Sequence, residues 1–151
     1  MYAMYMTYMI EGAGAAVEYA TVKDARDHFK DFLDAAFVGR PAVVRRESQR
    51  AVLVDAEWLR NRLAQLRPSN AEVVPENDGW SVSLPGLPIA ADGTTLDEAL
   101  EDVVGALREY AEDWVARLRN APNHANNQDV VTLTALSNDH QLIDWLTAAP
   151  R

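Results

Sequence analysis

Residues 21–54 read TVKDARDHFKDFLDAAFVGRPAVVRRESQRAVLV, and their pattern predicts a helix followed by a β-hairpin. Apolar side chains recur every three or four positions from Val22 to Phe37, which is the spacing of one continuous apolar helix face. Thr21 and Asp24 have the spacing of a capping box at the start of this helix, with Asp in place of the usual Glu. Gly39 ends the helix and Pro41 prevents its resumption. The segments on either side of residues 45–50 are rich in β-branched residues, which favours two paired strands.

The helix and the hairpin belong to a small unit that we place at residues 18–67. A short extended segment precedes the first helix, and a second amphipathic helix is predicted over 56–66. Pro68-Ser69-Asn70 is the expected linker to the rest of the chain. Because so small a unit buries little apolar surface, a homodimer is the simplest way to complete its core. The side chains expected in that dimer core are Phe29, Phe32, Leu33, Val43, Val52 and Val54.

A second unit is predicted over residues 71–119, beginning with a β-hairpin. Asp78-Gly79 is a strong hairpin signal, and apolar and polar residues alternate from Trp80 to Leu84 as in a strand with one solvated face. Asp92-Gly93 adds a further turn.

A long helix completes this second unit. Thr95 and Glu98 have the spacing of a capping box, and the apolar stripe that follows runs to Leu118. The expected fold class is therefore α+β: a helix–hairpin–helix unit, followed by a unit of one β-hairpin and one helix.

The two ends of the chain lie outside these units. Residues 1–17 hold all four methionines and are expected to form a disordered leader. Residues 120–151 begin with a polar loop, with a possible strand over 130–133 and a short helix over 139–146. This tail has too little apolar surface to fold alone, so it must dock on the rest of the chain or on a partner.

The charge is divided unevenly over the 151 residues. Residues 1–70 carry ten basic and nine acidic side chains, a balance of +1, whereas residues 71–151 carry four basic and fourteen acidic, a balance of −10. The total of −9 therefore argues against nucleic-acid binding only for the second half, since phosphate binding requires clustered positive charge. In the first half, Arg45, Arg46 and Arg50 cluster in the expected hairpin, and guanidinium groups suit phosphates and guanine edges.

Composition excludes several functional classes. The chain has no cysteine, which fits the reducing cytoplasm and excludes disulfides and thiolate chemistry. No apolar run approaches the roughly 20 residues of a membrane span. His28, His124 and His140 do not have the spacing of a metal site, and no phosphate loop or nucleophile elbow is present. We expect no enzyme activity, no metal and no cofactor.

The sequence motifs of the first unit resemble those of the Phd/YefM antitoxin family. The resemblance rests on Thr21-Val22-Lys23-Asp24-Ala25-Arg26, on Gly39-Arg40-Pro41-Ala42-Val43-Val44-Arg45-Arg46 and on the segment from Ala51 to Trp58. It implies a homodimer that binds a palindrome in its own promoter and neutralises a toxin encoded beside it. One departure is Glu47-Ser48, which stands where the family commonly has glycine at the hairpin turn. The DNA-binding positions that the resemblance implies are Thr21, Lys23, Arg26, Arg45, Arg46 and Arg50.

The second unit resembles the HicB antitoxin domain, a partial RNase H-like fold. The matching segments run from Asp78 to Pro88 and from Gly93 to Leu100, with Ile89-Ala90 where the family commonly has Gly-Cys. No metal-binding carboxylate set accompanies them, so the resemblance does not imply nuclease activity.

These observations together predict the antitoxin of a type II toxin–antitoxin pair, acting as a homodimeric DNA-binding autorepressor. A PIN-type ribonuclease is the favoured toxin and a RelE-type one is next. The C-terminal half would cover the toxin's active site with acidic and aromatic surface, or present Arg117, Arg119 or Arg151 to catalytic carboxylates. The candidate toxin-binding residues are Trp114, Arg117, Leu118, Leu142, Ile143, Trp145 and Leu146.

Two alternatives remain open. Surface pairing of arginine with acidic side chains would explain the basic residues without DNA, and the chain would then be a protein–protein adaptor. The tail helix would also be explained if it docked on its own second unit and not on a toxin.

Overall fold

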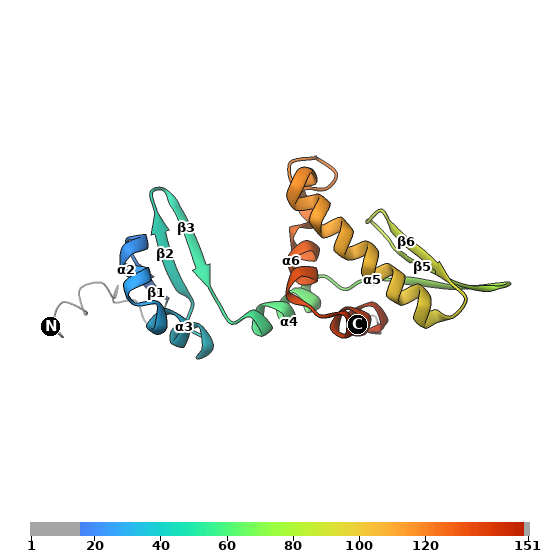
Figure 1. Ribbon diagram of the computed structural model, residues 1–151, viewed down its shortest axis with the longest axis horizontal. Helices are drawn as coiled ribbons and strands as arrows, with labels where there is room; N and C mark the ends of the chain where they lie inside the picture. Colours follow the sequence, from blue (N-terminus) through green and yellow to red (C-terminus); the bar gives the residue numbers. More distant parts are fainter. Residues whose placement is uncertain (1–15, 150–151) are drawn as a thin grey trace. The chain divides into compact units, whose positions relative to one another are not determined.

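The computed structural model describes residues 16–149 and has an α+β fold with two three-stranded sheets (Figure 1). The chain divides between Leu59 and Arg60 into an N-terminal and a C-terminal unit. The division lies inside helix α4 (Ala56–Leu66), and the segment predicted as the linker, Pro68-Ser69-Asn70, follows that helix. Among residues 16–149, no helix combines the length and the apolar character needed to cross a membrane.

The sheet of the N-terminal unit contains one strand more than the predicted hairpin. Strands β2 (Ala42–Arg46) and β3 (Gln49–Leu53) pair antiparallel around the turn at Glu47 and Ser48. Strand β1 (Val17–Tyr19) pairs in parallel with β2, so the strand order is β1-β2-β3. Residues 1–15 of the predicted leader lie outside the described residues, and Val17 already belongs to the sheet.

Two helices, and not one continuous helix as predicted, cover one face of this sheet. Helix α2 (Val22–Asp27) is capped by the Thr21 side chain, and helix α3 (Phe29–Phe37) follows after a break at His28. At the break, the ring Nδ1 of His28 lies 2.9 Å from the carbonyl oxygen of Asp24, and the ring stacks on Tyr19. Residue 28 leaves the helical region of the backbone, with φ −118° and ψ 29°, which the apolar spacing alone does not reveal.

The core of the N-terminal unit is thin, as predicted. Phe32, Ala35 and Ala42 form its buried centre, with apolar residues of all three strands packed against them. Large apolar side chains remain exposed around this centre. They are Val22, Phe29, Phe37, Val38, Val52 and Trp58.

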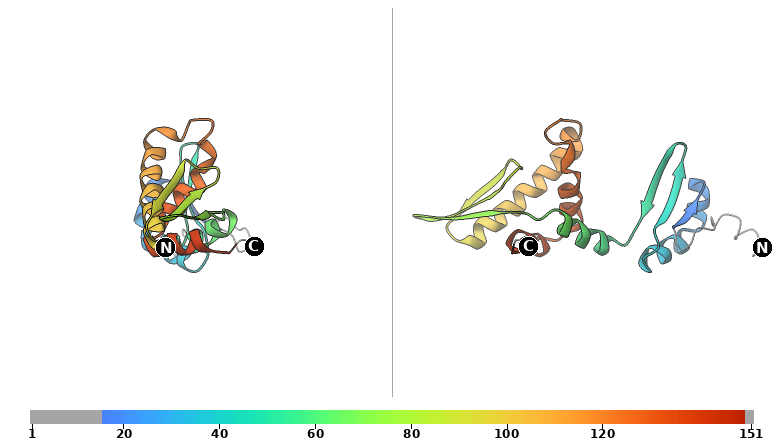
Figure 2. Two further views of the ribbon diagram at one scale, coloured as in Figure 1. Left: turned by 90° about the vertical axis from the view of Figure 1, so that its right-hand side faces the viewer. Right: turned by 180° about the vertical axis from the view of Figure 1, so that it is seen from behind.

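The sheet of the C-terminal unit is an antiparallel meander (Figures 1 and 2). Its strands are β4 (Glu72–Glu76), β5 (Gly79–Leu84) and β6 (Ile89–Gly93), with β5 in the centre. Strand β6 was not predicted, because Asp92-Gly93 indicated a turn. The structure continues β6 to Gly93, which pairs with Trp80.

Helix α5 (Leu96–Asp113) packs against β5 and β6 and begins with the predicted capping box. The Thr95 hydroxyl accepts from the Glu98 backbone N–H at 3.2 Å, and the Glu98 carboxylate accepts from the N–H of Thr95 at 3.3 Å. The predicted apolar stripe faces the sheet and the tail, since Leu100, Val103 and Leu107 are buried.

The tail after α5 is helical and packs on the same unit. One π-helical turn, η1 (Trp114–Leu118), extends α5, and a short 3-10 turn, η2 (Ala125–Asn127), leads into α6 (Gln128–Leu136) and α7 (Asp139–Thr147). The strand predicted over 130–133 is wrong, whereas the helix predicted over 139–146 is confirmed. Short apolar runs do not distinguish a buried helix from a strand, and α6 is apolar on most sides because it is enclosed.

Two glycines allow β5, β6 and α5 to approach one another closely. A Cβ on Gly93 would lie 2.5 Å from the backbone nitrogen of Ala99 and 2.9 Å from the carbonyl oxygen of Thr95. A Cβ on Gly79 would collide with the carbonyl group of Gly93, so Gly79 is required for packing and does not itself form the turn.

We expect Gly93→Ala to lower the free energy of unfolding by about 1–3 kcal/mol, since the colliding atoms belong to the backbone and cannot rotate away. Gly105→Ala is the matched control: Gly105 lies within α5 with open space around it, so alanine should stabilise the helix by about 1 kcal/mol. Urea unfolding followed by circular dichroism measures both changes, and equal effects of the two variants would contradict the packing described here.

Candidate functional site

The three arginines of the β2–β3 hairpin lie on two faces of the sheet. Because side chains alternate along a strand, Arg45 and Arg50, which pair across β2 and β3, lie on the same face as Glu18 and Val43. This face is opposite to the one that carries Val44 and packs against the helices.

Glu18 connects the two arginines on this face. Its Oε1 accepts a hydrogen bond from Nη2 of Arg45 at 3.1 Å, and its Oε2 lies 3.4 Å from Nη2 of Arg50. The Glu18 side chain is only 14% exposed, whereas those of Arg45 and Arg50 are 52% and 57% exposed. The structure therefore holds the two guanidinium groups together around one carboxylate.

The other predicted DNA-binding residues are placed separately. Arg46 pairs with Gln49 and lies on the helix-covered face of the sheet, at its exposed end. Lys23 and Arg26 lie on α2, where Arg26 is 3.6 Å from Asp27. Within residues 16–149, Lys23 and Arg46 form no ion pair.

The Thr21 side chain caps the N-terminus of helix α2. Its hydroxyl accepts from the backbone N–H of Asp24 at 3.1 Å and donates to the Asp24 carboxylate at 2.7 Å. The prediction of Thr21 as a helix cap is confirmed, and its role in DNA binding stays a prediction.

The predicted toxin-binding anchors lie mainly inside the C-terminal unit, so their role in toxin binding stays a prediction. Trp114, Leu142, Trp145 and Leu146 are buried in the main core cluster. Leu118 and Ile143 pack against the same cluster and are half-buried. The structure therefore favours the alternative in which the tail helix docks on its own unit.

Hydrogen bonds connect the tail to the segment that we predicted as a linker. The indole N–H of Trp145 donates to the carbonyl oxygen of Arg67 at 2.8 Å. The Arg67 guanidinium donates to both carboxylate oxygens of Asp129, at 2.9 and 3.1 Å, and the Ser69 hydroxyl donates to the carbonyl oxygen of Leu146 at 3.4 Å. The chain around residues 67–69 is therefore fixed to α6 and α7.

Two further polar clusters hold the tail in place, and the sequence did not indicate either. The Arg108 guanidinium donates to the carbonyl oxygens of Thr134 and Ser137 and to the Asp139 carboxylate, so it joins α5 to the connection between α6 and α7. A lone arginine on an acidic helix gives no signal of such a role.

The second cluster lies at the C-terminal end of α5. The indole N–H of Trp114 donates to the carbonyl oxygen of His124 at 2.8 Å, and the Tyr110 hydroxyl lies 2.9 Å from Nδ1 of His124. Asn127 completes it by donating from Nδ2 to the Tyr110 hydroxyl at 2.8 Å. The polar segment over 120–127 is thus attached to the core by α5.

Arg117 is the accessible member of the predicted toxin-binding set. It lies on η1 with an exposed side chain and donates to Asp113 at 2.8 Å. This hydrogen bond lowers the pKa of the Asp113 carboxyl and raises that of the Arg117 guanidinium. Arg119 is also exposed, and Arg151 lies outside the described residues.

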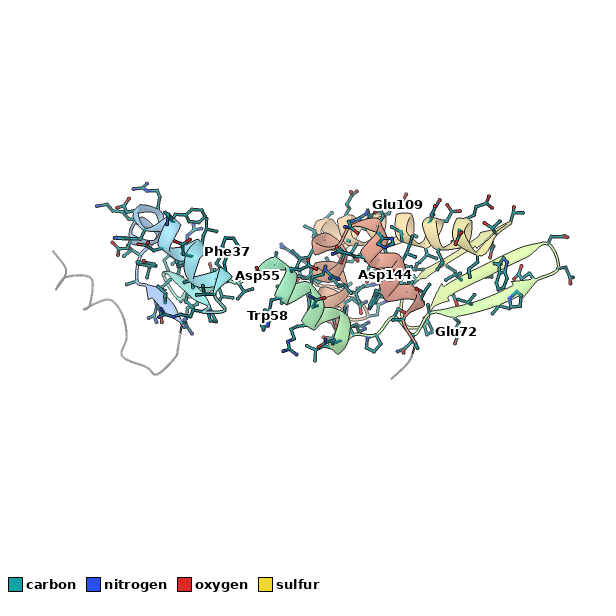
Figure 3. All side chains as sticks on the ribbon, turned by 90° about the horizontal axis from the view of Figure 1, so that it is seen from below. Phe37, Asp55, Trp58, Glu72, Glu109 and Asp144 are labelled. Carbon is teal, nitrogen blue, oxygen red and sulfur yellow. The ribbon has the colours of Figure 1, made fainter. Side chains whose placement is uncertain are left out.

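The surface of the C-terminal unit is mainly acidic. Glu72, Glu109 and Asp144, from β4, α5 and α7, are among its exposed carboxylates (Figure 3). No group of three or more histidine or acidic side chains in residues 16–149 has an arrangement that could hold a metal ion.

Comparison with solved structures supports this fold. A crystal structure from Syntrophomonas wolfei subsp. wolfei, described as the antitoxin part of a toxin–antitoxin system, is similar with a TM-score of 0.69 and 20% sequence identity. The similarity covers 83% of this chain and 94% of that one. No curated protein is significantly similar in sequence.

Comparison with protein families covers most of the chain. The model of the PHD-like family, described as the antitoxin of a RelE/RelB toxin–antitoxin system, matches residues 17–129. The match begins at β1 and ends in α6, so it includes both units. This chain therefore belongs to the PHD-like family of toxin–antitoxin antitoxins.

Proposed function

We propose that this antitoxin is a homodimeric autorepressor whose N-terminal unit binds operator DNA and whose C-terminal unit neutralises a ribonuclease toxin. The observation that carries the DNA-binding part is the arginine-rich hairpin. Residues 40–50 contain four arginines and one acidic residue in an otherwise acidic chain. Guanidinium groups suit the phosphate oxygens and guanine edges of DNA, and the strand pairing presents them at fixed positions.

Dimerisation is supported by the exposed apolar surface of the N-terminal unit. Phe29, Leu33 and Phe37 follow one another at intervals of four residues and form the α3 stripe, in which Phe29 is 53% and Phe37 66% exposed. Phe37 also lines a groove with Trp58 (both labelled in Figure 3) and Val54. A second copy would cover this surface and would present two basic hairpins to a palindromic operator.

We further propose that Val43, Val52 and Val54 contribute to the dimer through the sheet. Val52 is exposed beside the buried Val43, with which it pairs across β2 and β3. Phe32 belongs to the core of its own unit and supports the α3 stripe from within.

The toxin partner that we propose is a RelE-type ribonuclease, because the description of the matching family names RelE and RelB. A PIN-type ribonuclease is the second candidate. A ribonuclease must bind RNA phosphates and therefore carries positive charge, which is complementary to the −10 of residues 71–151. Arg117 is the residue that we propose for contact with toxin carboxylates, since its side chain is exposed on η1.

A gel-shift experiment with the DNA upstream of the gene tests the DNA-binding part. We expect the wild-type chain to bind, and Arg26→Ala/Arg45→Ala to weaken binding by roughly 10- to 100-fold through the loss of phosphate and base contacts. Arg119→Ala removes an exposed arginine of the other unit and is the control, with no expected loss. Absence of a shift at low salt, or an unchanged shift with the double variant, would favour a protein–protein adaptor.

A further inference from the structure

We propose that Glu18 is a positioning residue that holds Arg45 and Arg50 side by side as one clamp for a single DNA phosphate. The inference rests on the proposed DNA binding and adds how the site is organised. Glu18 then favours DNA binding, although its negative charge alone would be expected to weaken the binding of phosphate.

The sheet brings the three side chains together from segments far apart in the sequence. Glu18 is aligned with Val43 in the parallel pairing of β1 and β2, and Arg45 lies two residues further along the same face. Arg50 is directly opposite Arg45 in the antiparallel pairing of β2 and β3. Each guanidinium thus reaches one of the two oxygens of the same carboxylate, Oε1 for Arg45 and Oε2 for Arg50.

The Glu18 carboxylate reduces the repulsion between Arg45 and Arg50 in the hairpin. Like charges directly opposite each other on neighbouring strands destabilise the pairing, and flexible arginine side chains would move apart. The mostly buried Glu18 carboxylate offsets one of the two positive charges, so the cluster retains a net charge of +1. The entropy of ordering the two arginines is then lost on folding and not again on binding.

The clamp keeps free donors for a ligand. A guanidinium carries five N–H donors, and the described contacts to Glu18 use only one Nη2 atom of each arginine. Because both guanidinium groups are about half exposed, their remaining N–H groups are accessible from solvent. Two neighbouring forks with one net positive charge fit a phosphodiester, which carries one negative charge on two terminal oxygens.

A positioning role and a purely electrostatic role of Glu18 predict opposite changes in DNA affinity when Glu18 is removed. If Glu18 acts only through its charge, its removal makes the DNA-binding surface more positive and strengthens binding. If Glu18 positions the arginines, its removal releases both side chains and weakens binding despite the gained charge.

The experiment measures the affinity of the full chain for upstream DNA by fluorescence anisotropy over a range of salt concentrations. We expect Glu18→Gln to weaken binding by about 10-fold and to reduce the magnitude of the slope of log K against log salt by about 1, the equivalent of one phosphate contact. Glu47→Gln removes an exposed acidic charge from the same hairpin and is the matched control, with unchanged or slightly tighter binding.

A second variant at position 18 keeps the negative charge and changes only the length of the side chain. Glu18→Asp shortens the side chain by one methylene group, so the carboxylate can no longer reach both arginines, and we expect a loss similar to that of Glu18→Gln. In an Arg45→Ala/Arg50→Ala background, Glu18→Gln should have no further effect. Thermal unfolding of each variant checks whether the fold is retained.

The outcomes separate this inference from the function on which it rests. Wild-type binding with unchanged or tighter binding of Glu18→Gln, or full affinity of Glu18→Asp, would overturn the positioning role alone. Absence of any wild-type binding would overturn the proposed DNA binding, and the clamp with it.

Discussion

Replacing Trp145 with alanine is expected to lower the free energy of unfolding of the C-terminal unit by about 3–5 kcal/mol, because it removes a large buried side chain from a closed core. Trp145 is 6% exposed and packs in the cluster that includes Leu107 and Leu142. The variant also loses the hydrogen bond that the indole donates to the carbonyl oxygen of Arg67, which connects α7 to the start of the unit.

Urea unfolding followed by far-ultraviolet circular dichroism measures this effect without using the deleted indole as the probe. Val115→Ala is the control, since Val115 is a large apolar residue that is exposed on η1, and its truncation should change stability by less than about 0.5 kcal/mol. Unchanged stability of Trp145→Ala together with lost toxin binding would instead make Trp145 a toxin anchor.

The second large effect concerns the proposed dimer. We expect the double substitution Phe29→Asp/Phe37→Asp to weaken self-association by at least about 100-fold, since each buried phenylalanine contributes roughly 1.5–3 kcal/mol and each occurs in both copies. Both side chains are more than half exposed in the single chain, so the substitutions leave the core around Phe32 intact.

Sedimentation equilibrium of wild type and variant measures the change in mass, with a single chain at 16.8 kDa. Val115→Asp introduces the same charge at an exposed apolar position of the other unit and should remain a dimer. A monomeric wild-type chain at micromolar concentration, or a dimeric double variant, would contradict the role of the α3 stripe. Loss of the dimer should also weaken operator binding, since the two half-sites are then no longer bound together.

Local signals in the sequence predicted the elements that are stabilised locally. The capping box at Thr95 and Glu98, the apolar stripe of α5 and the cap at Thr21 are contained within a few residues, and the structure confirms them. The β2–β3 hairpin also forms as predicted although its turn lacks glycine. Glu47 adopts a left-handed conformation there, with φ 54°.

The features that the sequence did not predict depend on contacts between distant segments. Strand β6 forms because it pairs with β5 and packs under α5, which overrides the turn signal at Asp92-Gly93. Helix α6 and the fixed segment around Arg67 depend on the enclosure of the tail by α5, since Arg67 reaches Asp129 across more than sixty residues.

The candidate site was predicted only by residue type. Clustered arginines in the hairpin indicated nucleic acid, and the structure places Arg45 and Arg50 together and Arg46 on the other face. The role of Glu18 could not be foreseen, since its contacts depend on the parallel pairing of β1 with β2. Large apolar residues in a short tail are compatible with either an interface or a core. The sequence therefore could not distinguish toxin anchors from core residues at Trp114, Leu142, Trp145 and Leu146.

The most direct test of the proposed antitoxin action is the growth of cells that express the neighbouring short reading frame, with and without this chain. We expect the reading frame alone to arrest growth, and co-expression of this chain to restore growth and to yield a complex that purifies as one species. Unimpaired growth with the expressed reading frame alone, or continued arrest in the presence of this chain, would contradict neutralisation of a toxin encoded beside it.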